Sequence, residues 1–463
     1  MNKYIVWFQQ DLRLADNPAL FKAASAGVVL PIYIFDENNQ MGAASQWWLA
    51  QSLRLLNAEL KGQLTVYFGD PIAIIKKIVV NENIVGVFWN HVYEPSIMIR
   101  NESIKNDLIE NGILVETINA ALLSEPWQGV KADGSPYQIF APFMKNLTSH
   151  VLQPRRVLPK PSALVTKKIK GGDTVDAISF LTKNNWSHKL SQYWQPGEMA
   201  ALSQLKTFLE ASIHFYAIDR DYPAKPAISR LSPYLHFGEL SPNQVWYAVK
   251  QLKDKKNGNA FLRQLIWREF AYHLLYYFPS FPSKNWREQF DQFPWQKNKK
   301  LLDAWKKGIT GYPIVDAGMR ELWETGFMHN RVRMITASFL VKHCLVDWRL
   351  GAAHFFDCLV DADLASNSVN WQWVAGSGVD AAPFFRIFNP ILQAKKFDSK
   401  GAYIRRFIPE IAALPNRYLF APWEAPASVL ERANIKLGMT YPKPILDLQT
   451  SRERALLYYQ KIK

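Results

Sequence analysis

The sequence predicts an α/β domain with a parallel, five-stranded, Rossmann-like sheet at the N-terminus, followed by an all-α domain. Three observations predict this division. The 463 residues exceed what a single hydrophobic core usually holds. Short apolar runs alternate with helical stretches in the first third of the chain. Beyond residue 195 the apolar residues recur with the helical period, as in AFLRQLIWREFAYHLLYYF.

Five apolar runs are predicted as strands, at residues 3–8, 28–35, 64–68, 85–89 and 113–118. Because helix-length connections separate them, we expect the strands to be parallel and covered by helices. No G-x-G-x-x-G follows the first run, and no G-x-x-x-x-G-K-[ST] occurs anywhere in the chain. The sequence therefore carries neither the dinucleotide fingerprint nor the P-loop motif.

The predicted boundaries are 1–130 for the α/β domain, 131–195 for an interdomain linker rich in Pro, Lys, Gly and Thr, and 196–463 for the helical domain. Charge is unevenly divided between these parts. The formal net charge is −4 over residues 1–130 and +19 over the remainder. A basic region of this size favours a phosphate-rich partner such as nucleic acid, and ordinary solubilising charge stays open as the alternative.

Other classes of protein are disfavoured by what the sequence lacks. No apolar run approaches the ~20 residues that span a bilayer, and MNKYIVWFQQDLR is typical of a first strand rather than a signal peptide. We therefore expect a cytoplasmic protein without a membrane segment. The only cysteines, Cys344 and Cys358, are too few to ligate a structural zinc or an iron–sulfur cluster by themselves, so no metal site is predicted.

Long ordered motifs in the basic region indicate a family. They are WREF at 267–270, TGYPIVDAGMREL at 310–322, MHNRVRM at 328–334 and DADLASNSVNWQWVAGSGVDAAPFFRIFNP at 361–390. Together they resemble the flavin domain of the photolyase/cryptochrome family. WFQQDLRLADNPAL, GSPYQIFAPF and SRLSPYLHFGELSP extend the resemblance over nearly the whole chain, which is most similar to bacterial cyclobutane pyrimidine dimer photolyases.

The resemblance implies an α/β antenna domain, a linker, and a helical domain that binds FAD and DNA. It implies a deoxyribodipyrimidine photo-lyase, a carbon–carbon lyase that repairs cyclobutane pyrimidine dimers in damaged DNA. Repair would use light and an electron from excited, reduced FAD. We expect a monomer whose protein part supplies positioning, electrostatics and exclusion of competing reactions.

The residues that the resemblance assigns to FAD lie in four stretches of the helical domain. They are Tyr216, Ser229, Arg230, Leu231, Ser232, Phe261, Arg333, Asp361, Asp363 and Asn367. Arg333 and Asp361 resemble an ion pair beside the flavin ring, and Asn367 matches the residue that faces flavin N5. Ala227 and Ile228 depart from the Gly and Thr that are usual in the family, which removes one hydroxyl near the flavin phosphates.

Three further groups of residues are carried over from the family. Trp295, Trp348 and Trp371 match the relay that brings electrons to the flavin. The lesion cavity and its chemistry are assigned to Gln264, Trp267, Asn330, Met334 and Trp373, because aromatic faces stack on extruded bases. Contacts to DNA are assigned to Arg220, Arg268, Arg331, Arg386 and Gln393, since guanidinium groups pair with phosphate oxygens.

Three alternative functions remain. A (6-4) photolyase is disfavoured, because it would be expected to carry two His where this chain has Asn330 and Met334. A signalling cryptochrome is a blue-light-controlled binding protein and often has a long C-terminal extension, whereas this chain ends at Lys463. A DNA- or RNA-binding protein with a structural flavin is the third. Dimer photolyases usually have Glu at the position of Gln264. In carrying Gln there, this chain resembles (6-4) photolyases and animal cryptochromes.

A second, light-harvesting chromophore is the least determined feature. Pro95, Ser96 and Ile97 follow Tyr93 and Glu94, where some relatives use an Asn-Glu pair to hold a folate, and Gln9 replaces an Arg of their antenna pocket. Folate in a different pose, a deazaflavin and an empty pocket therefore all stay open.

Overall fold

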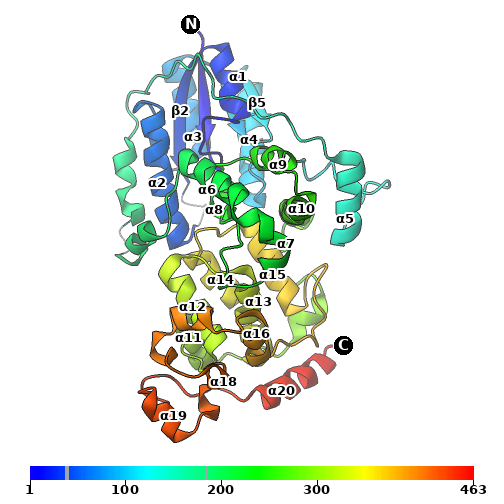
Figure 1. The fold of residues 1–463 in the computed structure, drawn as a ribbon. Coiled ribbons are helices and arrows are strands. Elements are labelled where there is room, and N and C mark those ends of the chain that lie inside the picture. The colour runs from blue at the N-terminus through cyan, green and yellow to red at the C-terminus, as the bar shows by residue number, and fades with distance from the viewer. Residues whose placement is uncertain (37–40, 183–184) are drawn as a thin grey trace. The chain divides into compact units, whose positions relative to one another are not determined.

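The structure is a computed structural model that describes residues 1–36, 41–182 and 185–463 (Figure 1). The chain packs into two compact units. Unit 1 comprises residues 1–214, 229–279 and 360–365, and unit 2 comprises residues 215–228, 280–359 and 366–463. Each unit is thus built from segments that are far apart in the sequence.

Unit 1 contains the predicted sheet. Its strands are β1 (Lys3–Phe8), β2 (Val28–Phe35), β3 (Thr65–Phe68), β4 (Ile84–Asn90) and β5 (Leu114–Ile118). They lie in the order β3-β2-β1-β4-β5, and all neighbouring pairs are parallel. The prediction of a five-stranded parallel sheet is confirmed. The order reverses between β1 and β4, the point at which open α/β sheets form ligand crevices.

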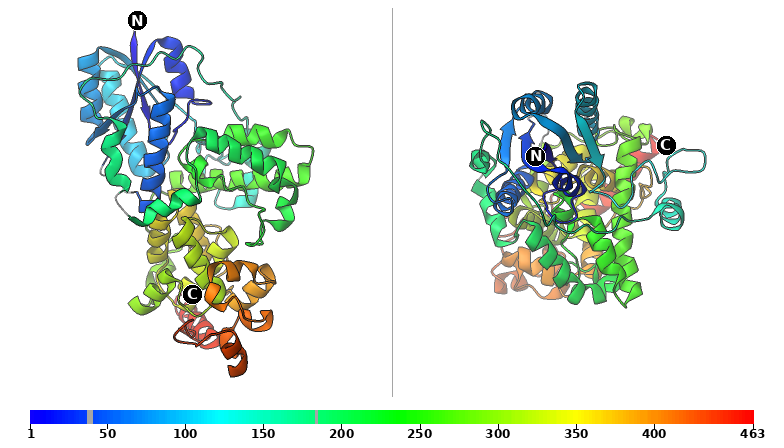
Figure 2. Two further views of the ribbon diagram at one scale, coloured as in Figure 1. Left: turned by 60° about the vertical axis from the view of Figure 1, so that its left-hand side comes forward. Right: turned by 90° about the horizontal axis from the view of Figure 1, so that it is seen from above.

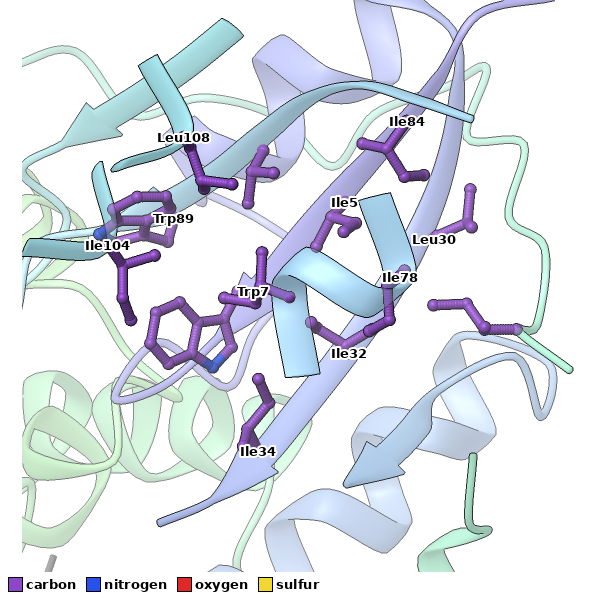
Figure 3. Close-up of a cluster of buried hydrophobic side chains, with 13 residues drawn as sticks. Ile5, Trp7, Leu30, Ile32, Ile34, Ile78, Ile84, Trp89, Ile104 and Leu108 are labelled. Carbon is purple, nitrogen blue, oxygen red and sulfur yellow. The ribbon is translucent and has the colours of Figure 1, made fainter. Parts of the chain in front are cut away.

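Helices cover both faces of the sheet, as the views in Figure 2 show. They are α1 (Pro18–Ala26), α2 (Ala43–Glu59), α3 (Pro71–Glu82) and α4 (Pro95–Glu110). On one face, Ile5 and Trp7 of β1 pack with Ile78 of α3 and Leu108 of α4 in a buried cluster (Figure 3). Helix α1 contacts β1, β2, β4 and β5. Because strand side chains alternate between faces, the near-continuous apolar runs serve two cores.

Helices from the later part of the chain belong to the same unit as the sheet. They are α5 (Phe140–Asn146), α6 (Glu198–Glu210), α8 (Ser232–His236), α9 (Pro242–Lys250) and α10 (Lys255–Tyr277). Glu239 joins them to the α/β part, because its buried carboxylate accepts from Trp48 Nε1 at 3.0 Å, Ser52 Oγ at 2.5 Å and Gly197 N at 2.6 Å. Burial raises the pKa of Glu239 to about 7.

Unit 2 is helical among the residues that the structure describes. Its helices are α7 (Tyr216–Asp219), α11 (Lys299–Lys307), α12 (Pro313–Thr325), α13 (Asn330–Ser338), α14 (Trp348–Cys358), most of α15 (Leu364–Ala375), α16 (Pro390–Phe397), α17 (Ala402–Phe407), α18 (Asn416–Leu419), α19 (Ala427–Arg432) and α20 (Leu448–Gln460). A π-helical turn, η6 (Phe339–His343), follows α13. The prediction of a helical C-terminal part is confirmed.

Short helical segments occupy much of the predicted linker. They include η1 (Leu147–Val151) and two 3₁₀ helices, η2 (Val175–Thr182) and η3 (Asn185–Gln192). The two units are defined by packing, and each combines segments from different parts of the chain. They therefore do not test the predicted domain boundaries at residues 130 and 195, which stay a prediction. Among the described residues, no helix is long and apolar enough to cross a membrane.

Candidate functional site

Asp363 is the centre of a buried charged cluster in unit 1. The hydroxyl of Tyr272 donates to Asp363 Oδ2, and His236 Nδ1 lies 3.6 Å from the same oxygen. Burial by itself raises the pKa of Asp363, but His236, the charge of Arg268 and the Tyr272 hydroxyl together hold it well below its usual range. Arg268 and Tyr272 are one turn apart on α10, so the charge of one and the hydroxyl of the other both act on one carboxylate. The cluster thus holds an ionised carboxylate among donors.

The segment 229–232 lies beside the acidic residues of the same unit. Ser232 Oγ donates to Asp361 Oδ2 at 2.6 Å, and Ser229 Oγ accepts from Leu231 N at 3.4 Å. Arg230 has a positive φ of 55° and its guanidinium lies 4.1 Å from the centre of the Trp194 ring. Phe261 is buried against Phe208, with 4.7 Å between ring centres.

Three of the residues assigned to FAD lie in unit 2. Tyr216 is buried beneath the guanidinium of Arg220, 5.1 Å from the ring centre, and burial raises its pKa to about 12. Asn367 Nδ2 donates to the carbonyl oxygen of Ala352 at 3.1 Å. Arg333 Nε donates to Met328 O at 2.7 Å. The expected pairing of Arg333 with Asp361, which belongs to unit 1, stays a prediction.

The tryptophans of the expected relay all lie in unit 2. Trp371 is buried on α15, with its ring centre 5.0 Å from Phe355 and 6.2 Å from Trp305. Trp348 is fully buried at the start of α14, and its Nε1 donates to Asn285 Oδ1 at 2.8 Å. Trp295 is half-buried against Phe293, with 4.4 Å between ring centres. All three indoles are fixed by aromatic packing or a hydrogen bond.

The residues assigned to the lesion are divided between the units. In unit 1, Trp267 stacks on Phe140 with 3.5 Å between ring centres and 7° between planes, and Gln264 lies one turn earlier on α10. In unit 2, Asn330 Nδ2 lies 3.9 Å from Met334 Sδ on α13. Trp373 is half-buried near the end of α15. A cavity that combines these groups stays a prediction.

The arginines assigned to DNA differ in their surroundings. Arg386 is exposed, and no hydrogen bond or ion pair of its guanidinium occurs among the described residues. Arg331 pairs with Asp221 at 2.8 Å and lies over the Phe397 ring. Arg268 donates to Ala121 O at 2.6 Å and is mostly buried. Gln393 lies on α16, which begins after the loop that carries Arg386. Arg386 is therefore the arginine of this group most available to a phosphate.

His343 makes the stability of this region sensitive to pH. Its Nδ1 lies 2.7 Å from Ser451 Oγ and its Nε2 lies 3.0 Å from Phe388 O, a pattern that suits the neutral ring. Burial lowers the pKa of His343 to about 4. The neutral ring therefore contributes its full stability above the pKa of about 6.5 that histidine has in the unfolded chain. That contribution is lost as pH falls from there through the folded pKa.

We expect His343 to cost about 1 kcal/mol of unfolding free energy when pH falls from about 7.5 to about 5.5. His343→Asn keeps a donor and an acceptor but does not titrate in this range, so its stability should depend less on pH. Chemical denaturation at both pH values measures the difference. Identical pH dependence in the two proteins would contradict the assignment.

Comparisons with known proteins identify the family of this chain. Residues 4–162 match the family described as DNA photolyase, and residues 261–461 match the FAD binding domain of DNA photolyase. A deoxyribodipyrimidine photo-lyase of Agrobacterium fabrum is 45% identical over 99% of this chain and 98% of its own length. The chain belongs to the DNA photolyase family.

Solved structures and a plant relative support the same family. A bacterial class III photolyase from Agrobacterium tumefaciens has a TM-score of 0.96 at 44% identity, and the match covers 100% of this chain and 98% of that one. Cryptochrome-2 of Arabidopsis thaliana is 37% identical over 97% of this chain and 78% of its own length. The family therefore contains both repair enzymes and cryptochromes.

The observed donors and acceptors fit the FAD that this family domain binds. In unit 1, the Ser232 hydroxyl donates to Asp361, and the Ser229 hydroxyl accepts from Leu231 N. Asn367 donates one of its two amide N–H groups to Ala352 O, and its carbonyl oxygen can accept from a ligand. The expected position of Asn367 beside flavin N5 stays a prediction.

At the switch point between β1 and β4, the carboxyl-terminal edge of the sheet carries buried N–H groups without a hydrogen-bond partner among the described residues. Arg100 of α4 donates to Gln9 Oε1 at 2.9 Å, pairs with Asp36 at 2.8 Å and lies over the Trp7 ring. Trp7 Nε1 and Gln9 Nε2 are buried without a hydrogen-bond partner among the described residues. Gln9 thus stands beside a guanidinium from another element, and this edge suits a ligand with carbonyl acceptors.

Four residues of these sites were not singled out from the sequence: Phe140, His236, Tyr272 and Asn285. Phe140 lies within GSPYQIFAPF, and His236 lies within SRLSPYLHFGELSP, so both were inside motifs that indicated the family. Nothing in their spacing shows that Phe140 stacks on Trp267. Asn285 has no comparable signal, because its role depends on Trp348, 63 residues later.

Proposed function

We propose that this protein repairs cyclobutane pyrimidine dimers in DNA, using light. The observation that carries the proposal is the composition of α15, in which Asn367, Trp371 and Trp373 occupy one short helix. Asn367 and Trp371 are four residues apart and so lie on neighbouring turns of one face. One rigid element thus carries the residues expected at the flavin, at the relay and at the lesion.

When bound and reduced, FAD would supply the electron that opens the cyclobutane ring, and that electron would then return to the flavin. The residues of this chain have other tasks. Asp363 keeps an ionised carboxylate beside the charge of Arg268 and the hydroxyl of Tyr272, and Asn367 offers an acceptor oxygen. Trp267, held by Phe140, presents an aromatic face on which an extruded base stacks. The basic charge of the chain attracts the DNA backbone.

The direct test is repair of irradiated DNA by purified protein under blue light, with a dark sample as control. We expect about one FAD per chain, loss of cyclobutane dimers only in the light, and persistence of (6-4) photoproducts in the same DNA. Loss of (6-4) photoproducts instead would reassign the substrate. A flavin-containing protein that clears neither lesion would favour the signalling alternative.

Two finer proposals accompany this function. We propose that the protein acts as a monomer in the cytoplasm, which light scattering of the purified protein and its location in the producing cell would test. We also propose a second chromophore at the β1–β4 edge, a folate or a deazaflavin. Extraction of the pigments and their absorption spectra would distinguish these two from an empty pocket.

Gln264 is expected to lower the efficiency of repair. Its Nε2 donates to Ala260 O within α10, and the side chain is half-buried. A neutral amide can still bind a lesion through hydrogen bonds, but it offers no proton when charge develops on the dimer. We therefore expect Gln264→Glu to raise the quantum yield by roughly twofold with little change in dimer affinity.

The measurement compares dimers split per absorbed photon for the two fully reduced proteins at saturating substrate. Gln264→Ala is the control, because it removes both the amide and any replacement acid and should lower the yield. An unchanged yield in Gln264→Glu would show that neighbouring residues already compensate for the missing carboxyl.

A further inference from the structure

The π-helical turn η6 (Phe339–His343) is entirely buried and is bonded to the main chain of the loop that carries Arg386. Lys342 Nζ donates to Arg386 O at 3.2 Å, and His343 Nε2 lies 3.0 Å from Phe388 O. Phe388 N donates to Ser338 Oγ, just before the turn, at 3.4 Å. Two of these hydrogen bonds come from the turn and one from the residue before it, and together they hold residues 386–388. The main chain of Arg386 is therefore held in place by the buried turn.

Lys342 is an unusual residue for this position. Its side chain is only 1% exposed, and the carbonyl oxygen of Arg386 is the one hydrogen-bond partner of Nζ among the described residues. The ammonium also lies 5.3 Å from the centre of the Phe384 ring. Burying a cation with so few partners is costly, and an apolar side chain would pack there at lower cost. Burial and the charge of Arg386 lower the pKa of Lys342 to about 7.

The placement of Lys342 has two effects on Arg386. The hydrogen bond fixes the carbonyl, and so limits the positions available to the Cα and side chain of Arg386. When Lys342 is protonated, the two cations also repel each other, which favours guanidinium positions away from the ammonium and toward solvent. The guanidinium itself is exposed and uncommitted among the described residues. A phosphate would meet a preorganised cation rather than a mobile one.

We propose that Lys342 is a positioning residue for DNA binding, which anchors the Arg386 loop so that the exposed guanidinium meets a DNA phosphate. This inference rests on the proposed function, because it takes Arg386 as a phosphate contact. Lys342 itself touches neither DNA nor flavin in this arrangement. Its effect on DNA should therefore pass through Arg386.

A double-mutant cycle tests the inference on the flavin-loaded, full-length protein. Arg386→Ala should weaken binding to dimer-containing DNA and lower the slope of log K against log salt by roughly 1. Lys342→Met should weaken binding roughly two- to tenfold, as expected for the loss of one hydrogen bond. In the Arg386→Ala background, Lys342→Met should have almost no further effect. Repair per bound dimer should be unchanged in Lys342→Met.

Two controls separate positioning from charge and from folding. Lys307→Met removes an exposed lysine of the same unit and should leave affinity nearly unchanged. The thermal stability of Lys342→Met should equal or exceed that of the native protein. If Lys342→Met does not fold, Lys342→Gln, which keeps a shorter donor, should show a smaller loss of affinity that again disappears with Arg386→Ala.

Independent, additive effects of the two substitutions would overturn the inference, and so would native affinity in Lys342→Met. If Arg386→Ala itself binds normally, Arg386 is no phosphate contact and the inference fails with it. The proposed function is judged separately, by repair of dimers by the native protein in the light. Failure of one is therefore distinguishable from failure of the other.

Discussion

Trp371→Phe is expected to reduce photoreduction of the oxidised flavin to background while leaving repair by chemically reduced protein nearly intact. Trp371 is buried against Phe355 and Trp305, so a phenylalanine keeps an aromatic ring in the site and leaves a small cavity. Phenylalanine is much harder to oxidise than tryptophan and cannot pass an electron onward. The expected relay would serve only to reduce the flavin, so an already reduced protein should not need it.

The measurement is the rate of flavin reduction under blue light with an external reductant, alongside dimer repair after chemical reduction. Trp305→Phe is the matched control, because Trp305 contacts Trp371 and is buried but lies outside the expected relay. Equal losses of both activities in Trp371→Phe would assign the residue to packing. Loss of photoreduction in Trp305→Phe would indicate a different electron route.

Trp267→Ala is expected to weaken binding of dimer-containing DNA roughly 5- to 150-fold, because stacking on an aromatic ring contributes ~1–3 kcal/mol per base. Phe140 already stacks on the ring and fixes its plane. The ring therefore meets a base without losing rotamer freedom at that moment. Binding of undamaged duplex should change little, since its bases remain stacked in the helix.

Affinities for damaged and undamaged DNA, measured at the same salt concentration, decide this prediction. Trp246→Ala is the control, since Trp246 is a half-buried tryptophan of α9 in the same unit with no expected role at the lesion. Trp267→Phe should retain part of the affinity. Parallel losses for both kinds of DNA would assign Trp267 to the backbone contact or to folding.

The sequence alone determined the fold class of this protein and its family. The five strands were predicted within one residue or so of their observed ends, because buried parallel strands are short apolar runs bounded by turn residues. The long motifs at 310–322 and 361–390 indicated the DNA photolyase family, which the comparisons confirm. Such features depend on neighbouring residues and on order along the chain, both of which a sequence contains.

The tertiary structure decided the surroundings of each site residue. The sequence assigns Arg331 and Arg386 the same expected role at DNA, but their surroundings differ. Arg331 pairs with Asp221, whereas Arg386 is exposed and its carbonyl oxygen accepts from Lys342. Phe140 meets Trp267 across 127 positions, and Asp363 meets Tyr272 across 91. These contacts form only when segments that are distant in the chain pack together. Their charge, burial and stacking therefore follow from packing, which local sequence patterns do not encode.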